Sequence, residues 1–101
     1  MGSVVMDIEA LAALVHPDKL TAEGFLRPER VLVIPGTDHS GEEAFHVYAV
    51  YPNDTTAEAL AWNKVKTMVR WMRNKIRKAS GEVRFRYVRV VREADLPPGL
   101  S

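Results

Sequence analysis

The sequence contains no cysteine, which excludes disulfide bridges, thiolate metal sites and a cysteine nucleophile. It has no apolar run near the ~20 residues that a bilayer-spanning helix needs. Residues 1–6 lack the basic start and the long apolar core of a signal peptide. Together these absences predict a soluble protein of the reducing cytoplasm, without a membrane partner.

The chain is 101 residues long, with 47% hydrophobic and 27% charged residues. This length and composition are typical of one folded domain. We therefore expect a single small α+β domain over residues 1–101. We interpret residues 1–3 as a remnant of cloning and residues 93–101 as a polar tail.

Hydrophobic periodicity predicts five elements in the order α-β-β-α-β. They are a helix over 4–16, strands over 31–34 and 44–51, a helix over 55–80 and a strand over 83–91. Pro17 ends the first helix, because the residue before a proline is disfavoured in the α region. Residues 17–29 are then a connector, and residues 36–43 form a polar hairpin loop.

A hairpin followed by a helical crossover predicts a three-stranded mixed sheet with both helices packed on one face. The wholly apolar run over 31–34 is typical of a strand buried on both faces. We therefore expect this strand in the middle of the sheet, with the strand over 83–91 antiparallel beside it.

The second helix is expected to begin with a capping box, in which Thr55 is the N-cap and Glu58 the third helical residue. The turn of 100° per residue predicts one apolar face on this helix, made of Ala57, Ala61, Val65, Met68, Val69, Met72, Ile76 and Ala79. A helix of about 25 residues is roughly 37 Å long, whereas an eight-residue strand spans about 27 Å. We expect the helix to overhang the sheet or to meet a neighbouring chain, which favours a homodimer.

The opposite face of the sheet is predicted to carry mixed aromatic, aliphatic and basic side chains, which are Tyr48, Val50, Val88, Val90, His46, Arg84 and Arg86. An apolar patch on a small domain favours a protein interface. The alternatives are a face exposed to solvent or covered by the tail, and a stacking platform for nucleotides.

Charge is divided along the chain. Residues 1–58 hold three basic and ten acidic residues, a net charge of −7, whereas residues 59–92 hold eleven basic residues and one acidic residue, a net charge of +10. On the second helix, four cations fall within about 60° of one another, from the 100° turn per residue; they are Lys66, Arg70, Arg73 and Arg77. Trp62 lies at one edge of this stripe, and Arg84, Arg86 and Arg92 can extend it.

The stripe predicts a binding surface for an acidic protein partner or, alternatively, for the phosphates of a nucleic acid. A third interpretation is a solvated surface whose charge is balanced in space by the acidic first half of the chain. The residues leave the partner's identity open.

The polar loop offers weak metal-ligand candidates in His39, Glu42 and His46, and a possible acid/base pair with Asp38. No nucleophile motif such as GxSxG accompanies them. The sequence therefore favours a non-enzymatic interaction module without a cofactor, with a small enzyme or metal-binding domain as the alternative.

Overall fold

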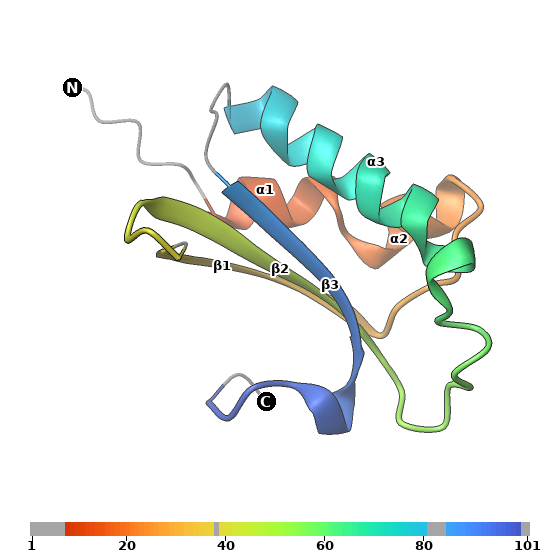
Figure 1. Cartoon of the computed structure of the whole chain (residues 1–101). Helices are drawn as coiled ribbons and strands as arrows, with labels where there is room; N and C mark the ends of the chain where they lie inside the picture. The colour runs from red at the N-terminus through yellow and green to blue at the C-terminus, as the bar shows by residue number, and fades with distance from the viewer. Residues whose placement is uncertain (1–7, 38, 81–84, 100–101) are drawn as a thin grey trace.

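The computed structural model describes residues 8–37, 39–80 and 85–99 (Figure 1). In this part of the chain, helices lie on one face of a three-stranded mixed sheet, so the predicted α+β class is confirmed. The elements are α1 (Ile8–Leu14), α2 (Pro17–Ala22), β1 (Arg30–Thr37), β2 (Glu43–Tyr51), α3 (Trp62–Ser80), β3 (Phe85–Arg92) and the short 3-10 helix η1 (Glu93–Asp95).

The first helix ends at Leu14, but the expected connector begins with a second helix, α2. Nδ1 of His16 accepts a hydrogen bond from the backbone N–H of Asp18 at 3.0 Å. Pro17 occupies the first turn of α2, where its missing N–H has no helical partner to lose. The same residues therefore end one helix and begin the next. The expected start of the first helix, over residues 4–7, lies outside the described residues.

The predicted strand order is wrong. The observed order is β1-β2-β3, with β1 antiparallel and β3 parallel to the central strand β2. The hairpin loop was predicted to begin at residue 36, but β1 continues through Pro35 and Gly36 to Thr37. A proline is tolerated in an edge strand, because its missing N–H can face away from the sheet. The central strand is instead β2, where Ala44, Phe45 and Val47–Tyr51 are buried on both faces.

α3 begins at Trp62 and not at the predicted capping box. Oγ1 of Thr56 accepts a hydrogen bond from the N–H of Ala59 at 3.1 Å, and this contact belongs to a turn that precedes the helix. The 19 residues of α3 span about 28 Å. That length matches the roughly 30 Å of the nine-residue β2. The helix does not overhang the sheet, so its length gives no reason to expect a dimer.

The main core lies between the helices and one face of the sheet. The predicted apolar face of α3 contributes Val65, Met68, Met72 and Ile76, all buried against β2 residues such as Val47. Two alanines assigned to this face are exposed, Ala57 before the helix and Ala79 near its end.

The side chains of β3 lie on the opposite faces of the sheet from those predicted. Val88 pairs in register with Val47 and Val90 with Ala49, so these valines pack in the main core. The second face carries a smaller cluster in which Leu96 covers Tyr48 and Val50, with Leu32, Ile34 and Val91 around them. The expected polar tail therefore supplies an apolar cover for part of this face.

Candidate binding surface

The exposed flank of α3 carries the predicted basic stripe, here called the basic ridge (Lys66, Arg70, Arg73 and Arg77). The three arginines are exposed and Lys66 is half-buried. Trp62 lies one helical turn before Lys66 and is 60% exposed, which is unusual for so large an apolar side chain. The ridge extends over about 17 Å from the rise of 1.5 Å per residue.

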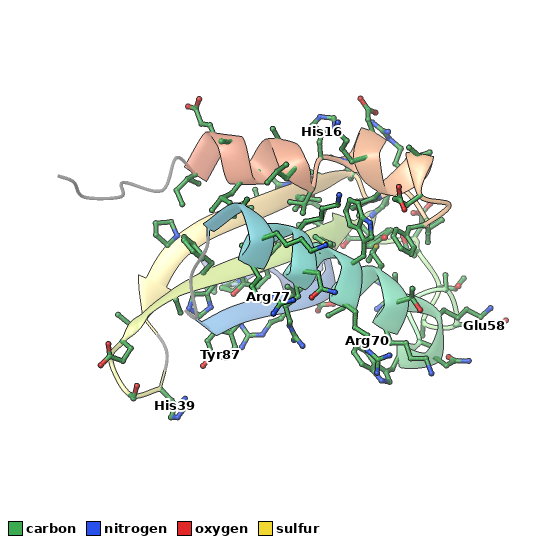
Figure 2. The ribbon with its side chains drawn as sticks, turned by 90° about the horizontal axis from the view of Figure 1, so that it is seen from above. His16, His39, Glu58, Arg70, Arg77 and Tyr87 are labelled. Carbon is green, nitrogen blue, oxygen red and sulfur yellow. The ribbon has the colours of Figure 1, made fainter. Side chains whose placement is uncertain are left out.

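The fold places the basic ridge above the free edge of the sheet. One flank of α3 faces the N-terminal helices, where Trp71 meets Phe25 edge-to-face with ring centroids 6.0 Å apart. Figure 2 shows Arg70 and Arg77 on the opposite flank, on the side of β3 and Tyr87. The ridge therefore lies beside the edge strand β3.

Three cations of the basic ridge, Lys66, Arg70 and Arg73, are not neutralised by direct contact with a carboxylate in the described part of the chain. Among the described residues, carboxylates form ion pairs with Arg27, Arg30 and Lys64. None lies within ion-pair distance of Lys66, Arg70 or Arg73 in the same residues. Three cations spaced along one helix flank thus keep their full capacity to bind an anion.

The predicted extension of the ridge onto the third strand is only partly visible. Arg84 and the side chain of Arg86 lie outside what the structure describes. Nε of Arg92 donates to the carbonyl oxygen of Thr55 at 2.8 Å, which ties the end of β3 to the loop before α3.

Sequence reasoning missed Arg89, which is exposed on the second face of the sheet. Its Nη1 donates to the hydroxyl of Tyr48 at 3.3 Å, and its guanidinium lies 6.0 Å from the Tyr48 ring centroid and 5.7 Å from that of Tyr87. Arg89 and Tyr87 are two positions apart in the strand, so their side chains lie on the same face, and this alternation is the sequence signal that could have found Arg89.

The candidate metal ligands His39, Glu42 and His46 do not come together as a metal site in the described part of the chain. His39 and Glu42 are exposed in the loop, while His46 lies on β2 and stacks on Tyr87 with centroids 5.0 Å apart. Nε2 of His46 is 3.0 Å from the carbonyl oxygen of Thr37. Within the described residues, no three potential ligands gather closely enough to hold a metal; Asp38 lies outside them.

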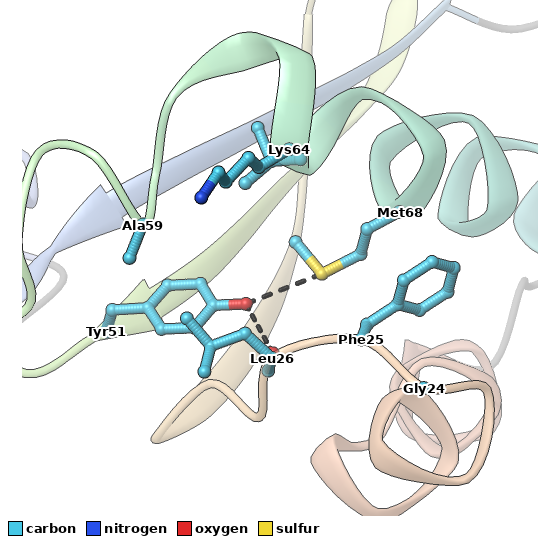
Figure 3. Close-up of a pocket in the computed structure, with 8 residues that line it drawn as sticks. Gly24, Phe25, Leu26, Tyr51, Ala59, Lys64 and Met68 are labelled. Atoms are coloured by element: carbon cyan, nitrogen blue, oxygen red, sulfur yellow. Dashed lines mark hydrogen bonds between the residues drawn. The ribbon is translucent and has the colours of Figure 1, made fainter.

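A pocket of about 270 Å³ opens at the start of α3 (Figure 3), lined mainly by apolar groups, with Lys64 also in its wall. At its base the hydroxyl of Tyr51 donates to the carbonyl oxygen of Leu26 at 2.6 Å and lies 3.4 Å from Sδ of Met68. Burial raises the pKa of Tyr51 to about 12, because the low-dielectric surroundings disfavour phenolate. The pocket can receive an apolar group, and its tyrosine is held protonated.

Comparison of the chain with models of protein families, with curated proteins and with solved structures finds no match. Among the described residues, no helix is both long enough and apolar enough to cross a membrane.

Proposed function

We propose that this chain is a non-enzymatic interaction module that binds an acidic segment of a partner protein on the basic ridge of α3. The observation that carries the proposal is the row of Lys66, Arg70 and Arg73, which has no carboxylate within ion-pair distance in the described structure. Arginine forks suit bidentate contacts with carboxylates and stay charged at every physiological pH.

A protein segment suits the charge distribution better than a nucleic acid. The whole chain has a net charge of only +1, because residues 1–58 are strongly acidic. The carboxylates of this half repel a long polyanion, which has to cross more of the protein surface than the ridge alone. A short acidic segment matches the ridge of about 17 Å.

Trp62 supports the same proposal. Tryptophan and arginine are the residue types most enriched among interface positions that dominate binding energy. An exposed tryptophan at the end of a row of arginines offers an apolar anchor beside the charges. We further propose that the module acts in the reducing cytoplasm, with which its lack of cysteine is compatible.

The test is a titration of the protein with a fluorescent ten-residue oligoglutamate, followed by anisotropy. We expect the Arg70→Glu/Arg73→Glu variant to bind about tenfold or more weakly than the native chain. The matched control Lys75→Glu/Lys78→Glu changes the charge equally on another part of α3, and it should retain most of the affinity. Affinity should also fall as salt shortens the Debye length from about 10 Å at 0.1 M to about 3 Å at 1 M.

Two results would overturn this assignment. Equal losses in both variants would show that only net charge matters. Tighter binding of a single-stranded RNA of equal charge, lost in the ridge variant, would assign the surface to nucleic acid. Sedimentation at low and high salt covers the remaining alternative, since a dimer held by the opposite charges of two copies dissociates in high salt.

A further inference from the structure

We infer that the acidic partner segment binds in extended form, as a fourth strand added to the free edge of β3 beneath the basic ridge. This inference rests on the proposed function and specifies its geometry. The sheet ends at β3, which pairs with β2 over all eight of its residues. In the described part of the chain no other strand lies along its outer side (Figures 1 and 2).

The two edges of the sheet differ in how they are protected. β1, the other edge, contains Pro35, and a proline in an edge strand discourages the addition of a further strand. β3 contains neither proline nor glycine and follows a regular register. In a regular edge strand about half of the backbone N–H and C=O groups point away from the sheet and can pair with an added strand.

Charge selects which strand can use this edge. β3 contains three arginines and no acidic residue, and the basic ridge lies above it. Pairing two copies edge to edge would bring like charges opposite one another, which is destabilising. An acidic strand would be attracted by the same residues, so the occupant we infer is a partner segment and not a second copy of β3.

The spacing of the two elements fits this arrangement. Alternate side chains of a strand point to the same face about 6.6–6.8 Å apart, and residues four apart on a helix rise about 6 Å. α3 and β3 run alongside each other in both views. Carboxylates at every second position of the added strand would therefore meet Lys66 and Arg70, which are four residues apart, while the intervening side chains extend the second face beside Val91.

The test uses a seven-residue peptide of alternating glutamate and valine with blocked ends. Three further peptides are methylated on the backbone nitrogens of the glutamates only, of the valines only, or of every interior residue. Methylation removes the N–H donor of a residue but leaves all charges in place. Because alternate amides face opposite edges and the strand can add in either direction, at least one half-methylated peptide keeps an intact pairing edge.

We expect that half-methylated peptide to bind like the parent and the fully methylated peptide to bind about tenfold or more weakly, since its backbone cannot pair. Amide hydrogen exchange within β3 should slow when the parent peptide is present at saturating concentration, and it should stay unchanged with the fully methylated peptide.

Three outcomes would overturn the inference while the proposed function stands: full methylation has no effect, all three methylated peptides lose affinity equally, or oligoglutamate binds the ridge and the alternating peptide does not. If neither oligoglutamate nor the alternating peptide binds, the proposed function itself fails.

Discussion

Nη2 of Arg30 in β1 donates a hydrogen bond to Oε1 of Glu93 at 2.8 Å, although the two residues are 63 positions apart. The bond crosses the second face of the sheet and holds the segment after β3 against it. Leu96, the residue after η1, is only 8% exposed and packs on Tyr48 and Val50. The end of the described chain is thus part of the folded structure.

Replacing Leu96 by alanine should lower the free energy of unfolding by about 2–3 kcal/mol, because it removes buried methyl groups and leaves a cavity. Urea denaturation measures the change. Pro98→Ala is the matched control in the same segment, since Pro98 is exposed. Equal midpoints for the two variants would show that Leu96 does not contribute to the core.

The Glu29→Gln variant should be more stable than the native chain at pH 7. The neighbouring Glu93 raises the pKa of Glu29 through a shared hydrogen bond, and the same bond, together with Arg30, lowers the pKa of Glu93. A carboxyl with a raised folded pKa contributes stability at low pH that is lost as pH rises through that pKa. The advantage of Glu29→Gln, compared by urea midpoints from pH 4 to pH 7, should therefore grow with pH. An advantage independent of pH would contradict the shared bond.

Stability should fall between pH 10 and pH 12 because of Tyr51. Its pKa is about 12 in the folded chain and near 10 when unfolded, so the unfolded state loses its proton first and is favoured as pH rises. The loss approaches roughly 2–3 kcal/mol at 1.36 kcal/mol per pKa unit. Tyr51→Phe should lose this dependence, at a cost of about 1 kcal/mol at neutral pH for the missing hydrogen bond. Parallel pH profiles of the two proteins would refute the prediction.

Gly36→Ala should move the His46 ring with little change in stability. A Cβ at position 36 would lie 3.0 Å from Cδ2 of His46, so the ring must shift from its present position relative to Tyr87. Alanine reduces the entropy of the unfolded chain and stabilises by about 0.4–1 kcal/mol, which offsets the lost contacts. NMR should show changed ring-current shifts at His46 and Tyr87. Unchanged shifts would mean that the ring is not held where the structure places it.

Regular periodicity made part of the fold predictable. The 3.6-residue spacing identified the buried face of α3, and it placed Lys66, Arg70 and Arg73 together on one flank. It could not identify the start of α3, because Thr56 forms a local turn with the same hydrogen-bond type as a helix cap. It also missed α2, since six residues carry little periodicity.

The sequence by itself determined the α+β class, the antiparallel hairpin and the clustering of cations on one helix flank, since these depend on spacing within a segment. Only the tertiary structure decided that β2 is central, that Val88 faces the helices and that the basic ridge lies above the open edge of β3. Alternation within a strand shows which side chains share a face, but the pairing of Val47 with Val88 decides which face that is. Such pairings join distant segments, and no local pattern records them.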